Sequence, residues 1–245
     1  MPRLAWSHLG RIDYEAARSL QERLASARRE GAIEDLILTL EHPPVVTIGR
    51  NAPDPFAGRP VAEGAPPRLR VDRGGAATWH GPGQLVIYPV VALRSGGRGV
   101  RQFVLDLEEA LCAVARDLGV SAVRRQGLPG AWVEGVAPRK LGSVGIAVRR
   151  GVSLHGASLN VTRGSARGFD GFDPCGLPGV VATSLEDEAP GLGASVEQVA
   201  EAYVARWAGI AGRGDVHRVG AAELGGTRMP RAGDFAGGDE VSTWT

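Results

Sequence analysis

The chain has 245 residues, of which 43 % are hydrophobic, and its formal net charge is +1. This length fits one large domain or two small ones, with enough apolar residues to bury a sizeable core. A charge so close to zero gives no global field that would favour nucleic acid or a membrane surface, and the longest apolar run, LVIYPVVAL, is too short for a membrane-spanning helix.

Cysteine usage and the first residues indicate the compartment. The chain has two cysteines, Cys112 and Cys175, which do not make a disulfide scaffold in a protein of this length. The first ten residues, MPRLAWSHLG, lack the apolar core of a secretory signal. We therefore expect a protein of the reducing cytoplasm, with neither nucleic acid nor membrane as a partner.

The first predicted element is a helix over residues 13–30. Asp13 is placed to cap it and Gly31 to end it, and the expected buried face consists of Ala16, Leu20, Leu24 and Ala27. The apolar stretches DLILTLE and PVVTIG follow, and they predict two strands joined by a proline turn. Residues 51–67 then hold five prolines and no apolar period, which predicts a long loop.

The middle of the chain predicts more strands and one long helix. RLRVD and QLVIYPVVAL are typical of strands on either side of a glycine-rich turn, and residues 101–118 have the period of a helix. GAWVEG, LGSVGIAVRR and GVSLHGASLNV predict three further strands separated by glycines.

The last predicted helix covers residues 195–210, with Ser195 and Gln198 at capping-box spacing. Strands in clusters with few helices favour an α/β (α+β) fold, in which helices pack on a mixed sheet, over a doubly wound one. We expect one catalytic domain over residues 1–211 and a poorly ordered glycine-rich tail over 212–245.

The stretch RGGAATWHGPGQL, residues 73–85, is the densest candidate for a binding site. Its glycines allow the backbone to approach a ligand, Arg73 offers a fork of donors, and His80 lies among glycines rather than on an apolar face. A plain turn between two strands explains the glycines equally well. The stretch is neither a P-loop nor a Rossmann fingerprint, and no pair of cysteines or HExxH helix in the chain indicates a metal.

The two cysteines differ in context. Cys112 lies beside the apolar face of the 101–118 helix, which predicts a buried structural thiol. Cys175 lies in the loop FDPCGLPG, where a thiol can be exposed and backbone N–H groups can hold an oxyanion, although a small residue at a tight turn is the other interpretation.

Lys140 is the single lysine among 28 basic residues. Chance explains one lysine, but so does a position that needs an ammonium able to lose its proton, which a guanidinium cannot do near neutral pH.

Several stretches together resemble the lipoyl(octanoyl) transferase family. They are EHPPVVTIGR (41–50), RGGAATWHGPGQLVIYP (73–89), GAWVEG with RKLGSVGIAVRRGVSLHGASLNV (139–161) and FDPCGLPG (172–179), and the match runs in order from about residue 8 to residue 210. The resemblance implies the biotin/lipoate ligase fold, with a mixed sheet flanked by helices in one domain.

The resemblance also implies a catalytic pair, in which Cys175 carries the acyl group as a thioester and Lys140 assists it. The implied substrate-binding residues are Arg73, Gly74, Gly75, Ala76, Ala77, Thr78, Trp79, His80, Ser143, Val144, Gly145, Gly156, Ala157 and Ser158. Two of these depart from the family, since Ala76 replaces a frequent acidic residue and Trp79 a frequent tyrosine. These departures concern the shape of the acyl pocket and leave the Cys/Lys pair untouched.

The family reaction transfers octanoyl from octanoyl-acyl carrier protein to lysines of lipoyl domains, in 2-oxoacid dehydrogenase complexes and the glycine cleavage H protein. It starts from a thioester, so the resemblance implies neither ATP nor a metal. Three alternatives stay open at this point: an ATP-dependent lipoate or biotin ligase on the same fold, a cysteine thioester hydrolase, and a non-catalytic lipid- or carrier-binding module.

Overall fold

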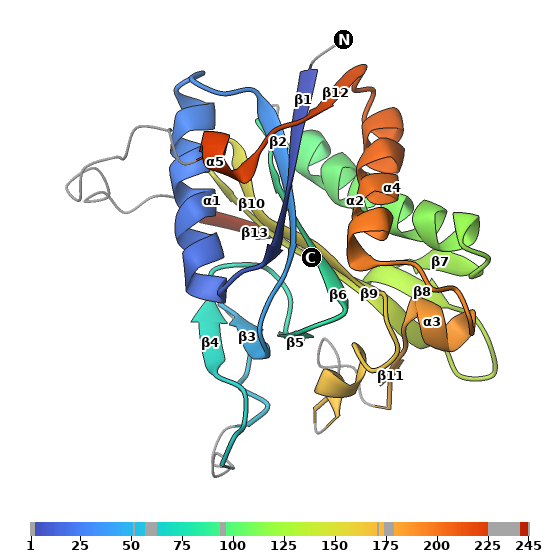
Figure 1. Cartoon of the computed structure of the whole chain (residues 1–245). Coiled ribbons are helices and arrows are strands. Elements are labelled where there is room, and N and C mark those ends of the chain that lie inside the picture. The colour runs from blue at the N-terminus through green and yellow to red at the C-terminus, as the bar shows by residue number, and fades with distance from the viewer. Residues whose placement is uncertain are drawn as a thin grey trace.

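The computed structural model describes residues 3–50, 52–56, 63–93, 97–170, 172–173, 179–224 and 241–244. Their largest element is a mixed sheet that holds most of the strands (Figure 1). Its strands, in spatial order, are β12 (Asp215–Arg218), β1 (Arg3–Arg11), β2 (Asp35–Glu41), β6 (Gln84–Val90), β10 (Val152–Asn160), β9 (Arg139–Arg149), β8 (Leu128–Val133) and β7 (Ala122–Arg125). β12, β1 and β2 run parallel, whereas the neighbours from β2 to β7 pair antiparallel.

Three further features complete the strands. β11 (Val181–Ala182) and β13 (Val241–Trp244) pair with β9 outside the main order. A small second sheet consists of β4 (Arg68–Val71), β3 (Val45–Gly49) and β5 (Ala77–His80). β5 therefore occupies part of the stretch that the sequence predicts as a turn.

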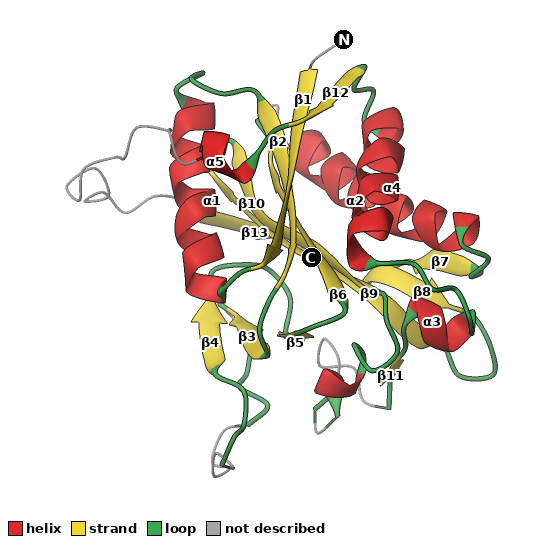
Figure 2. Cartoon of the chain, in the orientation of Figure 1, coloured by secondary structure: helices red, strands yellow, loops and turns green. Residues whose placement is uncertain are grey.

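Helices cover both faces of the main sheet (Figure 2). α1 (Tyr14–Arg29) lies on one face, and α2 (Gly97–Asp117) and α4 (Val196–Ile210) lie together on the other. The short helices are η1 (Arg167–Phe169), α3 (Leu185–Glu188) and α5 (Ala221–Leu224). The predicted class, helices on a mixed sheet, is confirmed, and no helix in the described part of the chain is long and apolar enough to cross a membrane.

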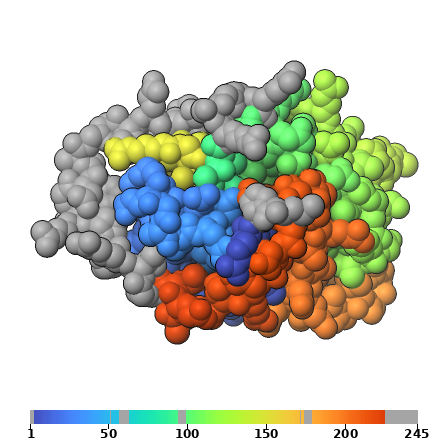
Figure 3. Space-filling model, turned by 90° about the horizontal axis from the view of Figure 1, so that it is seen from above, coloured from blue at the N-terminus to red at the C-terminus, as the bar shows by residue number. Residues whose placement is uncertain are grey.

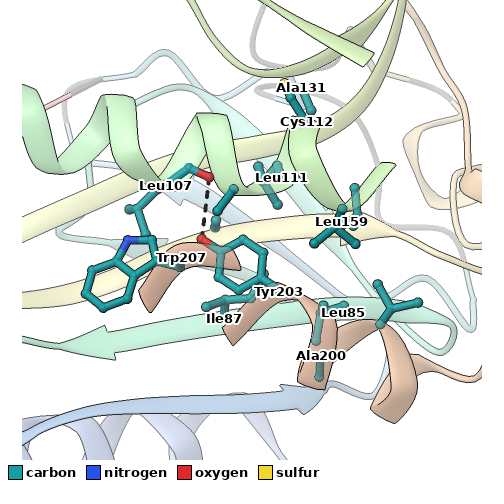
Figure 4. Close-up of a cluster of buried hydrophobic side chains, with 14 of the residues drawn as sticks. Leu85, Ile87, Leu107, Leu111, Cys112, Ala131, Leu159, Ala200, Tyr203 and Trp207 are labelled. Atoms are coloured by element: carbon teal, nitrogen blue, oxygen red, sulfur yellow. Dashed lines mark hydrogen bonds between the residues drawn. The ribbon is translucent and has the colours of Figure 1, made fainter. Parts of the chain in front are cut away.

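The larger apolar core fills the space between the sheet and the α2–α4 pair. In Figure 4 Leu107 and Leu111 of α2 face Tyr203 of α4, whose hydroxyl donates to the Leu107 carbonyl. Cys112 lies in the same core and is fully buried, as the sequence predicts.

Local sequence signals set the helix ends. The Asp13 carboxylate caps α1 by accepting from the Glu15 and Ala16 N–H groups, and Ser195 and Gln198 form the predicted capping box of α4. The predicted inner face of α1 is partly wrong, because Ala16 is exposed and Tyr14 is buried instead.

The C-terminal stretch contains more regular structure than we expect from its composition. β12 pairs with β1, α5 packs on β1, and β13 pairs with β9. Figure 3 shows the blue N-terminal strand bordered by orange and red segments. These elements belong to the stretch 212–245, whose expected poor order stays a prediction, as does a domain boundary after residue 211.

Candidate active site

A cavity lies where the small sheet meets β6, β9 and β10. The space between its walls amounts to about 440 Å³, part of it open to solvent. Eleven of the fourteen predicted substrate-binding residues line it: Arg73, Gly75, Ala76, Thr78, His80, Ser143, Val144, Gly145, Gly156, Ala157 and Ser158. The fold thus brings three separate sequence segments to one cavity, and their role in binding stays a prediction.

The remaining three predicted residues support the wall. Gly74 donates its N–H to the Ile146 carbonyl at 3.0 Å and so ties the loop to β9. Ala77 packs in a small apolar cluster, and Trp79 lies so close to Gly168 of η1 that a Cβ there would overlap its ring. Trp79 therefore holds the segment that leads toward residue 175.

Two glycines keep the β9–β10 wall open. The strands pair with Ser143 opposite Ser158 and Gly145 opposite Gly156. A Cβ on Gly145 would lie 2.9 Å from the Gly74 carbonyl oxygen, and one on Gly156 would lie 2.2 Å from the Ile87 carbonyl oxygen. Any larger residue at either position would therefore force the backbone around the cavity to shift.

Arg73 fastens the cavity loop to the small sheet. Its guanidinium donates to the Thr47 carbonyl at 2.8 Å, to the Thr47 hydroxyl at 2.9 Å and to the Gly74 carbonyl at 2.8 Å. The side chain is 7 % exposed. Arg73 therefore shapes the cavity in addition to lining it.

A chain of amide hydrogen bonds fixes the tautomer of His80. The Asn160 amide N–H₂ donates to the Thr183 carbonyl, so its oxygen accepts from Gln84, whose N–H₂ also donates to the Trp79 carbonyl. The Gln84 oxygen must then accept from Nδ1 of His80, 2.7 Å away. His80 is consequently protonated on Nδ1, and its Nε2 carries a lone pair.

Aromatic residues that the sequence analysis missed form another wall. Tyr14 and Tyr88 line the cavity. The Nδ1–H of His42 donates to the Ile12 carbonyl, so Nε2 of His42 accepts from the Tyr88 hydroxyl at 2.8 Å. His155 also lines the cavity, with a left-handed φ of 57° and its Nε2 2.9 Å from Asp72. In the sequence, the position of His155 directly before Gly156 in SLHGAS is the one feature that could have indicated it as a cavity residue.

Burial keeps these titratable groups uncharged. Burial, with His42 nearby, lowers the pKa of His80 to about 3, and burial also lowers the pKa of His155. Burial raises the pKa of Tyr14 to about 12 and that of Tyr88 well above its usual value. At neutral pH these four side chains are therefore uncharged, which suits contact with an uncharged acyl chain.

Lys140 lies on β9 three residues before the cavity wall and is 2 % exposed. Its Nζ donates to the Pro129 carbonyl at 2.8 Å and lies 4.3 Å from the centre of the Trp132 ring. The described residues lining the cavity do not include it.

A β-bulge nevertheless puts Lys140 on the cavity face. Residues three apart in a regular strand point to opposite faces. Here Ala131 of β8 pairs with Gly142 and Trp132 pairs with Lys140, so Leu141 is an extra residue. Leu141 faces the α2 core, and Lys140 and Ser143 then share the other face.

The second predicted catalytic residue, Cys175, lies outside the described residues. The described regular elements that precede and follow it along the chain are η1, which Trp79 contacts, and β11, which pairs with Arg139 and Lys140 of β9. Within the described ranges no three His, Cys, Asp or Glu side chains gather as metal ligands would.

Comparison with known proteins identifies the family. The model described as the lipoyl protein ligase A/B catalytic domain matches residues 13–208. An octanoyltransferase of Desulfovibrio desulfuricans is 44 % identical over 194 residues, which cover 75 % of this chain and 76 % of that protein. One of Nocardia farcinica is 45 % identical over 186 residues, with 74 % and 71 % covered. The chain belongs to the octanoyltransferase family.

Solved structures confirm the fold of this octanoyltransferase. A bipartite lipoate protein ligase of Thermoplasma acidophilum superimposes with a TM-score of 0.64 and 17 % identity, over 91 % of this chain and 89 % of that one. A lipoate-protein ligase A bound with ATP gives 0.64 and 18 %, over 91 % and 90 %. At such low identity the likeness concerns the fold alone, and the predicted biotin/lipoate ligase-like fold is confirmed.

Proposed function

We propose that this octanoyltransferase takes octanoyl from octanoyl-acyl carrier protein, holds it as a thioester on Cys175 and passes it to a lysine of a lipoyl domain. The acceptors are lipoyl domains of 2-oxoacid dehydrogenase complexes and the glycine cleavage H protein. The observation that carries the proposal is the position of Lys140: the only lysine of the chain lies on the face of β9 that forms the cavity wall.

The cavity supports an acyl ligand by the small residues of its floor and by the uncharged histidine and tyrosine side chains that line it beside Arg73. Ser143 to Gly145 and Gly156 to Ser158 give it a floor of small side chains. Each buried methylene contributes about 0.8 kcal/mol, so the methylene and methyl groups of an octanoyl chain supply roughly 5 kcal/mol.

In the first half-reaction the Cys175 thiolate attacks the carrier thioester, the bond from the acyl carbon to the carrier sulfur breaks, and the carrier leaves as a thiolate. An ordinary thiol has a pKa of about 8.5 and is mostly protonated at neutral pH. The Lys140 ammonium supports the thiolate electrostatically. Exchange of one thioester for another is close to neutral in energy, so binding decides its direction.

In the second half-reaction the acceptor amine attacks the Cys175 thioester, the C–S bond breaks and an amide forms. An exposed lysine with a pKa of about 10.4 is neutral in about one molecule of a few thousand at pH 7. Lys140, once it has lost its proton, takes the proton of the attacking amine. Arginine is able to do the first task but not this one.

Intact-mass spectrometry tests the proposal. Mixing the enzyme with octanoyl-acyl carrier protein should add one octanoyl group to the enzyme, and an apo lipoyl domain should then receive it. Acylation of the domain only with free octanoate and ATP would support a ligase, and release of octanoate without the domain would support a hydrolase.

The cavity floor gives a prediction about chain length. Gly145→Ala places its Cβ 2.9 Å from the Gly74 carbonyl, so the loop must shift and the cavity shortens. Excluding two methylenes costs about 1.6 kcal/mol, which lowers kcat/KM for octanoyl-carrier about 15-fold. Butanoyl-carrier should be affected far less.

The control for this substitution is Gly209→Ala, because a Cβ at Gly209 in α4 meets nothing within 4 Å. An equal loss for butanoyl and octanoyl donors in Gly145→Ala would show that the substitution disturbs the site as a whole.

A groove beside Lys140 is the expected carrier-docking surface. It lies between α2 and the β7–β8 hairpin and is lined by Arg101, Arg124 and Arg125 together with Leu128 and Pro129. The Pro129 carbonyl is the hydrogen-bond acceptor of the Lys140 ammonium, so this groove ends next to the reaction site.

Two arginines at the turn between β9 and β10, Arg149 and Arg150, do not line this groove. Arg149 pairs with Asp72 and Glu22, and Arg150 occupies a turn with a φ of 47°. The docking prediction therefore rests on Arg124 and Arg125.

Carrier proteins are typically acidic, so the double variant R124S/R125S should raise KM for octanoyl-carrier several-fold at low salt and little at high salt. The matched control is R3S/R206S, which removes two exposed charges that pair with Asp215 and Asp117. A KM that is insensitive to salt in the unmodified enzyme would contradict docking on this groove.

A further inference from the structure

One peptide group links Lys140 to a buried carboxylate on α2. The carbonyl of Pro129 accepts from Lys140 Nζ at 2.8 Å, and the next N–H, that of Gly130, donates to Glu108 Oε1 at 2.9 Å. These two groups belong to the same amide, and in a trans peptide they point in opposite directions. Lys140 and Glu108 therefore lie at its two ends.

The conformation of Gly130 makes this arrangement possible. Its φ of +123° is one that side-chain-bearing residues rarely adopt, and a Cβ would lie 2.2 Å from the Gly142 carbonyl oxygen. In this conformation the N–H of Gly130 points toward α2 and donates to Glu108. Glu108, which is only 6 % exposed, occupies the α2 position that faces it.

A carboxylate at the N–H end polarises an amide and makes its carbonyl oxygen a stronger acceptor for a cation. We propose that Glu108 is a positioning residue for Lys140, which holds the ammonium and stabilises its charged form through the Pro129–Gly130 peptide group. The inference rests on the proposed function of Lys140 in octanoyl transfer.

Other charged groups near this pair lie on the neighbouring elements. Burial raises the pKa of the Glu108 carboxyl group, whereas the Gly130 N–H and the positive charges of Arg124 on β7 and Lys140 on β9 lower it. Arg101 of α2 and Arg125 of β7 line the groove between α2 and the β7–β8 hairpin, which Glu108 and Arg124 also line. The cationic neighbour of Lys140 on β9, Arg139, is paired with Glu188 of α3 at 2.6 Å. The described residues of β8 carry no titratable side chain.

The single lysine makes a direct test possible. Labelling the protein with ¹³C-lysine gives one side-chain NMR signal, which reports the protonation of Lys140 alone. Glu108→Gln keeps an oxygen that accepts from the Gly130 N–H but removes the charge. The midpoint of the Lys140 titration should fall by about 1.5 pH units, the coupling expected of charges about 8 Å apart at an effective dielectric of about 20.

Glu109→Gln is the matched control, because Glu109 is the next residue of α2 and pairs with Arg116 and Arg124. Its midpoint should stay close to that of the unmodified protein. An unchanged midpoint in Glu108→Gln, or an equal fall in both variants, would overturn the inference.

Half-reaction rates give the second readout. Measured from the octanoyl-enzyme, the pH profile of amide formation in Glu108→Gln should move to lower pH by the same interval as the NMR midpoint. A purely structural role of Glu108 would instead lower the rate equally at every pH and contradict the inference. If the unmodified enzyme forms no octanoyl-enzyme, the proposed function fails, while the NMR titration still decides the link between Glu108 and Lys140.

Discussion

Cys175→Ala is expected to lower octanoyl transfer more than about 10³-fold, because the acyl group then has no nucleophile on which to rest. The octanoyl adduct seen in the intact mass of the unmodified enzyme should be absent from Cys175→Ala and Cys175→Ser. Thermal unfolding of both variants should be close to that of the unmodified protein if the thiol has a chemical role.

Cys112→Ala is the internal control for this experiment. Cys112 is fully buried, and burial raises the pKa of its thiol to about 12, so it does not supply a thiolate at neutral pH. The variant should retain the adduct and lose about 1 kcal/mol of stability, because a small buried group is removed from the core. An adduct that maps to Cys112 would contradict the role proposed for Cys175.

Lys140→Arg is expected to impair amide formation about 10²- to 10⁴-fold, the usual contribution of a general base, and acyl-enzyme formation by much less. A guanidinium keeps the positive charge that supports the thiolate, but it cannot lose its proton near neutral pH. Single-turnover rates of the two half-reactions, measured with octanoyl-carrier and with an apo lipoyl domain, separate these effects.

Lys140→Met provides the comparison, since it removes the charge as well as the base and should impair both steps. Equal losses of both half-reactions in Lys140→Arg would mean that Lys140 acts by setting the thiolate or the geometry and does not act as a base.

The sequence by itself determined what local signals encode. The Asp13 cap and the Ser195–Gln198 capping box mark the start of α1 and α4 where the pattern predicted, because a cap depends on residues a few positions apart. The family motifs likewise located the segments 73–80, 143–145 and 156–158. The composition alone showed that Lys140 is the only lysine of the chain.

Only the tertiary structure decided how these pieces meet. β1 and β12 are more than 200 residues apart, and neither strand is recognisable until parallel pairing brings the two together. Tyr14 lines the cavity because α1 buries it against the sheet, although the apolar period of the sequence did not include Tyr14 in the buried face of the helix.

The chemistry of the site depends on the same long-range geometry. The extra residue Leu141 turns Lys140 to the cavity face, and the amide chain through Gln84 and Asn160 fixes the tautomer of His80. Glu108 acquires its place opposite Lys140 through a peptide group of a third element. Strand register, hydrogen-bond direction and burial arise from contacts between distant segments, so no window of the sequence contains them.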